Sequence, residues 1–218
     1  MAKFLPIAGN LSGSVGANTY SHNRGGSYVK RRGVPTNPNS SRQQSVRGWL
    51  SNLSSGWKAL TAPDKNAWAA FALAHPKTDS LGNTVAVTGA QYYNALNSRL
   101  LDGGAAKVDT APVVMAPSGL LTFSIVRTSA TSGTVTFTST PLGAGLKIQL
   151  WMSMPTAGDR NPNMAQCRLV GYSAAAQATS WVVTLPHSWA VGQTVTFFAL
   201  VLGVDGQVSG ALKAKVTA

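Results

Sequence analysis

Apolar and polar residues alternate with a period of two through the C-terminal half of the chain. Val135 and Phe137 alternate with threonines, and Ile148, Leu150 and Met152 share one face of another segment. Seven such segments are separated by Gly, Pro or Asn, a spacing typical of a sandwich of two antiparallel sheets. The pattern predicts strands over 120–128, 133–139, 146–154, 166–173, 179–185, 194–202 and 208–216.

Between residues 40 and 103 the apolar period changes to that of helices. Ser40 and Gln43 have the spacing of a capping box, which marks the start of a first helix. Thr61, followed by Pro63 and Asp64, marks the start of a second. The apolar positions of the first helix are four, three, four and three residues apart, which places them on one face: Val46, Leu50, Leu53, Trp57 and Leu60.

The second helix is expected to end at His75, because Pro76 follows it. A third helix is expected from Thr88, which has Gln91 at capping-box spacing, to Gly103. The segment 83–87 before it is compatible with a short strand.

Aromatic residues are dense in these helices, and they admit two interpretations. Trp49, Trp57 and Trp68 are compatible with base stacking on a nucleic acid. We favour a core, because the tryptophans lie on or beside the apolar faces of two short helices that must fill a small module. The predicted core of the helical module is Trp49, Leu53, Trp57, Trp68 and Tyr93.

Residues 1–39 have a different composition, which is rich in Gly, Ser and Asn. Pro35 and Pro38 exclude a helix there, and Ser27–Arg32 is expected to be a short strand that ends in three cations. A segment with so few apolar residues cannot bury enough surface to order itself. We therefore expect an extended arm that orders against the rest of the chain, a neighbouring subunit or a polyanion. The alternative is a mobile tail with solvated charges.

Positive charge is concentrated in the same part of the sequence. The chain has a net charge of +12, and residues 1–60 carry eight Lys and Arg with no acidic residue. Such an excess favours acidic partners. The residues that we expect to make these contacts are Arg24, Tyr28, Lys30, Arg31, Arg32, Arg42 and Arg47.

Composition sets the broad class. Hydrophobic residues form 44% of the 218, which excludes a wholly disordered chain. The single cysteine, Cys167, cannot form an intramolecular disulfide, and we expect it to be a small buried thiol in a strand. The apolar run at the start of the chain is interrupted by Pro6, so we expect it to be too short for a secretory signal. We also expect no membrane helix, because no apolar stretch approaches the length of one. The predicted fold is α+β and multidomain: an arm at 1–39, a helical module at 40–108 and an immunoglobulin-like sandwich at 109–218.

The residues that carry enzyme chemistry are scattered. His22, His75 and His187 lie in three different segments, with no Cys or acid at metal-ligand spacing. The six acidic residues are all Asp and are dispersed, so no pair is evident for acid–base catalysis. We expect no catalytic residues, no metal site and no cofactor.

Two family resemblances follow from specific residues. The segment 197–209, Phe-Phe-Ala-Leu-Val-Leu-Gly-Val-Asp-Gly-Gln-Val-Ser, resembles the sixth strand, hairpin and last strand of fibronectin type III modules. Residues 8–105 resemble a family of uncharacterised proteins of tailed phages and prophages. The second resemblance rests on spaced residues, which are Gly13, Gly16, Arg24, Tyr28, Lys30, Pro35, Asn37, Pro38, Arg47, Trp57, Leu60, Asp64, Trp68, Thr88, Tyr93, Asn97 and Gly103.

The phage resemblance implies a virion or virion-assembly protein that is assembled in the host cytoplasm and has other virion proteins as partners. The leading hypothesis is a capsid decoration or cement subunit anchored through its arm, repeated within the particle, with a tail, neck or fibre-base component as an alternative. A second alternative is non-specific nucleic-acid binding by the basic region. A third is sugar binding by the sandwich, through Trp151, Trp181 or Trp189.

Overall fold

The computed structural model describes residues 2–3, 12–23, 26–34, 36–78, 84–113, 116–138, 142–158, 160–178 and 180–217. The chain divides into two compact units, Met1–Gln44 and Ser45–Ala218. The first boundary therefore lies a few residues beyond the predicted one at 39.

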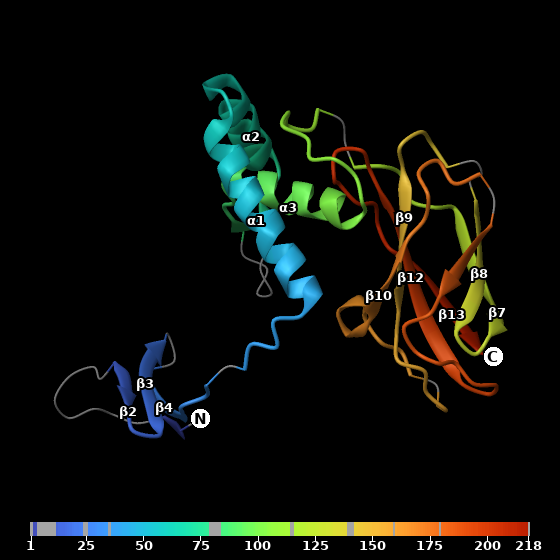
Figure 1. The fold of residues 1–218 in the computed structure, drawn as a ribbon, viewed down its shortest axis with the longest axis horizontal. Helices are drawn as coiled ribbons and strands as arrows, with labels where there is room; N and C mark the ends of the chain where they lie inside the picture. Colours follow the sequence, from blue (N-terminus) through green and yellow to red (C-terminus); the bar gives the residue numbers. More distant parts are fainter. Residues whose placement is uncertain are drawn as a thin grey trace. The chain divides into compact units, whose positions relative to one another are not determined.

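The first unit contains a small antiparallel sheet (Figure 1). Its strands are β1 (Ala2–Lys3), β2 (Gly13–Val15), β3 (Asn18–Asn23) and β4 (Gly26–Arg31), in the spatial order β1-β4-β3-β2. The expected strand at 27–32 is present as β4. The expected extended arm is not simply extended, because β2 and β3 are joined by a two-residue turn. Gly16 has φ +57° in that turn, a conformation that glycine adopts without steric cost.

Three helices begin the second unit: α1 (Ser41–Ala59, which starts within the first unit), α2 (Ala62–Ala74) and α3 (Gly89–Asp102). Both capping boxes are formed, at Ser40 with Gln43 and at Thr88 with Gln91. The Thr61 hydroxyl accepts from the Asp64 amide at the start of α2. Between α2 and α3, β5 (Lys77–Thr78) pairs with β6 (Thr84–Val85), which is the short strand expected in this region.

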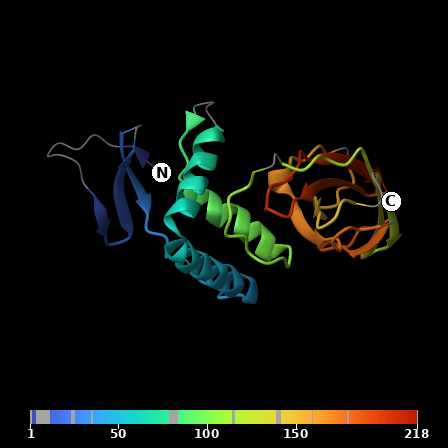
Figure 2. The same ribbon diagram turned by 90° about the horizontal axis from the view of Figure 1, so that it is seen from above.

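Seven strands then form two sheets that pack against each other around one buried cluster, and Figure 2 shows the pair of sheets end-on. One sheet has the order β11-β8-β7 and the other β10-β9-β12-β13. Each of the seven strands lies within a few residues of its predicted range. Their bounds are β7 (Thr122–Ser129), β8 (Ser132–Thr138), β9 (Lys147–Met152), β10 (Arg168–Tyr172), β11 (Trp181–Thr184), β12 (Thr194–Leu202) and β13 (Leu212–Thr217).

The interior of the sandwich is built from the alternating residues of facing strands. Val135 and Phe137 of β8 and Ile148, Leu150 and Met152 of β9 all lie in one buried cluster, as their period of two predicts. The last strand begins later than expected, at Leu212, because after the 203–207 turn Val208 forms only an isolated bridge with Leu202 and the Ser209 side chain, in place of a backbone carbonyl, accepts from the Val201 amide.

The sheet that contains β12 is buried on both faces over part of its area. Val195, Phe197, Ala199 and Val201 face the sandwich core, whereas Thr196, Phe198, Leu200 and Leu202 alternate with them and are also buried. Near Leu202 this outer face is covered by the end of α3, since a Cβ at Gly103 would lie 3.0 Å from the Leu202 side chain.

The helices and the sandwich therefore form one compact unit, whereas the sequence suggested a division at 108. Hydrogen bonds between described residues join them at three points. The Tyr172 hydroxyl donates to the Asp102 carboxylate, Lys147 donates to the Gly103 carbonyl, and Arg99 donates to the Gly206 carbonyl. Gly206 packs so closely on α3 that a Cβ there would lie 2.3 Å from the Leu96 carbonyl oxygen.

Two local predictions were wrong. Cys167 is half-buried and caps the short 3₁₀ helix Met164–Gln166 immediately before β10, because the chain turns there before it enters the sheet. Burial raises the pKa of its thiol, and Lys213 acts in the opposite direction. Leu50 is exposed, because the described contacts of α1 with the helical core begin only at Leu53.

Candidate interaction site

The cationic end of β4 is the most distinctive feature of the N-terminal sheet. Lys30 pairs with Thr19 and Arg31 pairs with Asn18, and the Arg32 amide donates to the Ala17 carbonyl at 2.7 Å. All three cations are exposed beside the β2–β3 turn. Since residues 1–60 contain no acid, no carboxylate of this segment neutralises them. Arg24, which was expected in the same group, lies outside the described residues.

The two faces of this sheet differ in character. On one face the register brings together Val15, Tyr20 and Val29 with Arg31 at the end. On the other face lie Tyr28 and Lys30 among hydroxyl side chains, and the Ser14 and Thr19 hydroxyls hydrogen-bond at 3.0 Å. The sheet therefore presents one mixed apolar face and one hydroxyl-rich basic face.

The described part of this unit has little buried surface. Ser27 is its only buried side chain, Tyr20, Tyr28 and Val29 are half-buried, and Val15 is 72% exposed. Among the described strands β2 lies at the edge of the sheet, so one row of its backbone groups faces away from β3. A small sheet with few buried apolar contacts is marginally stable alone, and docking against another surface stabilises it.

Arg42 and Arg47 lie on the first two turns of α1, and both are exposed. No acidic residue accompanies them in the first turn of that helix. A cation at a helix N-terminus is unfavourable with respect to the helix dipole. The residues expected at the interface therefore occur in two segments, the end of β4 and the start of α1.

The helical module has a tightly packed aromatic core. Leu53, Trp68 and Tyr93 are buried, as we expected, and the Trp68 and Tyr93 rings meet edge to face with centroids 5.5 Å apart. Trp57 is half-buried and its ring centroid lies 5.6 Å from that of Tyr93. Trp49, at the middle of α1, is half-buried and lies outside the core cluster to which we assigned it. Trp68 is therefore a structural residue with no face available for a base.

A polar cluster at Asp109 was missed by sequence reasoning. The Asp109 carboxylate accepts hydrogen bonds from the Tyr93 hydroxyl at 2.9 Å and from Lys107 at 2.5 Å. The hydrogen bond from Lys107 lowers the pKa of Asp109 and raises the pKa of Lys107. Burial, followed by the bond to Asp109, raises the pKa of Tyr93. Only the Lys107–Asp109 spacing is visible in the sequence, because Tyr93 reaches the pair from α3.

The remaining candidate residues do not converge. In the part of the chain that the structure describes, no three His, Cys, Asp or Glu side chains are close enough to share a metal ion. Trp189 is fully buried and its indole donates to the Gln193 carbonyl, so it offers no platform for a sugar. Trp181 is half-buried against the sandwich core. No helix among the described residues is long and apolar enough to cross a membrane.

Comparison with known proteins gives no family. No protein-family model and no curated protein matches the chain. A family 76 glycoside hydrolase from Bacteroides thetaiotaomicron is similar over 47% of this chain and 20% of its own, with 10% identity and a TM-score of 0.35. The fibronectin type III domain of human collagen XX is similar over 50% of this chain and 99% of its own, with 16% identity and a TM-score of 0.33. The chain thus spans about a fifth of the hydrolase, and the assignment of a sandwich rests on its own strand order.

Proposed function

We propose that this protein is a non-enzymatic structural subunit of a tailed-phage particle, held in place through its N-terminal unit. Its most direct role is that of a capsid decoration or cement protein. The observation that carries the proposal is the N-terminal sheet, in which the described residues combine an exposed cationic end with almost no buried apolar surface. Such a unit gains order and affinity together when a partner covers it.

Two kinds of contact account for the docking. The outer edge of β2 can accept a strand from a neighbouring subunit through backbone hydrogen bonds. Lys30, Arg31 and Arg32 complement an acidic surface, which sets register and speeds encounter. The resemblance of residues 8–105 to phage proteins supports a virion as the setting, and the fibronectin type III-like sandwich fits a module appended to an exposed structural protein. The same contacts also serve a tail, neck or fibre-base component.

The test is incorporation into particles of the phage that encodes the chain. We expect the full chain to be present in purified particles by quantitative mass spectrometry, and the chain that lacks residues 1–38 to be absent. The change of Lys30, Arg31 and Arg32 to Gln should reduce occupancy most at low salt, and the difference from the unchanged chain should shrink at high salt, since salt screens exposed charges. A matched control removes the same charge elsewhere, by changing Lys58, Arg168 and Lys215 to Gln. Normal incorporation of the truncated chain contradicts the proposal.

Nucleic-acid binding is a second candidate, favoured by the eight cations without an acid in residues 1–60. Titration of duplex DNA at several salt concentrations tests it. If all eight cations meet phosphates, log K should fall with log[salt] with a slope of about −7, and the triple Gln variant should reduce that slope by about 3. Negligible affinity at low salt removes this candidate and leaves the docking proposal in place.

A further inference from the structure

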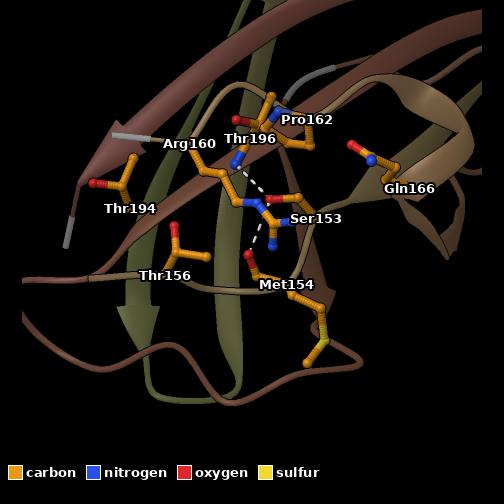
Figure 3. A pocket seen from close by; sticks show the side chains of 8 residues that line it. All are labelled: Ser153, Met154, Thr156, Arg160, Pro162, Gln166, Thr194 and Thr196. Atoms are coloured by element: carbon orange, nitrogen blue, oxygen red, sulfur yellow. Dashed lines mark hydrogen bonds between the residues drawn. The ribbon is translucent and has the colours of Figure 1, made fainter. Parts of the chain in front are cut away.

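A polar pocket of about 240 Å³ opens on the sandwich. It lies between the end of β9, the start of β12 and the segment that leads to the 3₁₀ helix. Figure 3 shows the Arg160 side chain extending across it, with Thr156 and Thr194 to one side and Gln166 to the other. Its described lining residues are Ser153, Met154, Thr156, Arg160, Pro162, Gln166, Thr194 and Thr196.

The walls of this pocket are held in place by hydrogen bonds. Thr156 and Thr194 exchange backbone hydrogen bonds of 3.1 and 2.8 Å, which fix the chain just after β9 against the start of β12. The Asn163 amide donates to the Gln166 side chain, and Lys213 of β13 donates to Asn161. A site whose walls are already ordered loses less conformational entropy when a ligand binds.

Arg160 sets the charge of the ligand. It is the only charged side chain among the described lining residues, and it is exposed. A guanidinium presents five N–H donors in a planar fork that matches a carboxylate or a phosphate, and it has no acceptor. The pocket is therefore suited to an anionic group.

The hydroxyl groups of the pocket indicate what else the ligand carries. Ser153 donates its hydroxyl proton to the Met154 carbonyl and accepts from the Thr196 amide, and Thr156 donates to the Gly158 carbonyl (Figure 3 shows the two bonds of Ser153). With their protons committed, Ser153 and Thr156 can offer a ligand only lone pairs. They therefore select ligand groups that donate, such as the hydroxyls of a sugar. The Met154 and Pro162 side chains add apolar atoms to the lining that can meet C–H groups.

We propose that this pocket binds a single sugar ring that carries an anionic group, either a carboxylate or a phosphate. Its volume lies below the roughly 300–1,000 Å³ of pockets for drug-sized ligands, which fits one ring and not an oligosaccharide. Arg160 binds the anionic group, and the Ser153 and Thr156 oxygens accept from ring hydroxyls. This binding does not depend on how the N-terminal unit docks.

The test is a titration of the full chain by NMR with hexoses of gluco, galacto and manno configuration. Each is presented as the neutral hexose, the uronic acid and the hexose 6-phosphate, with inorganic phosphate as a further probe. We expect at least one acidic sugar to bind saturably and its neutral counterpart to bind at least about tenfold more weakly, since a charged hydrogen bond contributes at least ~1.4 kcal/mol. The uronic acids and the phosphates distinguish the two sources of charge.

Three results would overturn this proposal: no saturable binding of any acidic sugar, equal binding of the neutral hexose, or inorganic phosphate binding as tightly as the hexose phosphate. Variants then locate the site. Arg160→Gln should weaken binding at least about tenfold, and Thr156→Val should weaken the sugar without affecting inorganic phosphate. Arg168→Gln, which removes the same charge outside the pocket, should stay within about twofold of the unchanged protein. Unaltered binding by Arg160→Gln, in a variant with an unchanged circular dichroism spectrum, places the ligand elsewhere and refutes the assignment.

Discussion

The indole nitrogen of Trp68 donates a 2.8 Å hydrogen bond to the backbone carbonyl of Asp109, 41 residues further along the chain. The Asp109 carboxylate accepts in turn from the Tyr93 hydroxyl. One residue of the connection that follows α3 therefore binds both α2 and α3 through their two largest buried aromatic side chains. This arrangement makes the connection part of the helical core and not a linker to the sandwich.

Replacement of Trp68 by Phe should destabilise the helical module by about 2–4 kcal/mol. The substitution leaves the Asp109 carbonyl without its donor and opens a cavity where the larger ring packed. The measurement is urea unfolding followed by circular dichroism at a helical wavelength. Trp57→Phe is the matched control, since Trp57 is half-buried, and it should cost about 1 kcal/mol or less. Equal losses in the two variants would show that the bond to Asp109 contributes little.

Gly206→Ala should destabilise the second unit by at least ~2 kcal/mol, through strain and overpacking together. Gly206 has φ +81°, and a Cβ there would lie 2.3 Å from the Leu96 carbonyl oxygen and 2.7 Å from its carbon. Backbone atoms of a helix cannot move aside as a flexible side chain can.

Gly210→Ala provides the control for this position. A Cβ at Gly210 meets nothing within 4 Å and its φ is not positive, so the change should stay within about 0.5 kcal/mol. Thermal unfolding of both variants gives the comparison. A Gly206→Ala protein as stable as Gly210→Ala would mean that α3 does not pack on the 203–207 turn in solution.

The same residues show how far the sequence determines this fold. Helix starts at Ser40, Thr61 and Thr88 were predicted because a cap is a local device: the hydroxyl and the amide that it binds lie three residues apart. The seven strands were predicted because alternation is also local. These signals specify each element without reference to its neighbours.

Contacts between distant segments could not be predicted in the same way. The sequence around Asp109 does not indicate a contact with Trp68. The sequence around Gly206 indicates only a hairpin glycine, and not its contact with Leu96. The buried outer face of β12 appears in the sequence only as an uninterrupted apolar run from Phe197 to Leu202, without the segment that covers it. Likewise, Arg160 is an isolated cation in the sequence, and its pocket exists only because β9 and β12 bring hydroxyls from two segments together.

Lowering the pH should reduce the free energy of unfolding of the wild-type protein more than that of an Asp109→Asn variant. The Asp109 pKa lies below its ordinary value of 3.8, chiefly because of the hydrogen bond from Lys107. A lowered pKa in the folded state contributes stability above the ordinary value, and this contribution is lost as the pH falls through the folded value. Urea unfolding between about pH 5 and pH 2.5 covers that window, since both values lie near or below an ordinary Asp pKa. Parallel profiles for the two proteins would show that the carboxylate is not engaged in solution.

Raising the pH should reduce the free energy of unfolding through Tyr93. Burial raises its pKa above the ordinary value of 10.0. The neutral hydroxyl therefore contributes stability below that value, and the contribution is lost as the pH rises through the higher folded value. A Tyr93→Phe variant has no such proton to lose, so its unfolding free energy should decline less between about pH 9 and pH 11. A steeper decline in the variant would contradict the burial of this hydroxyl.

The N-terminal sheet should show low hydrogen-exchange protection in the isolated protein. Amides of β3 and β4 are hydrogen-bonded, but the described part of the sheet buries only Ser27, so local opening exposes little apolar surface and costs little. The amides of β12, which is buried on both faces, provide the internal reference in the same spectrum. Protection of β3 and β4 should rise when the docking partner is added, because a covered sheet opens less often. If these strands are already as protected as β12 in the monomer, the sheet is complete by itself, and the reason for expecting it to dock disappears.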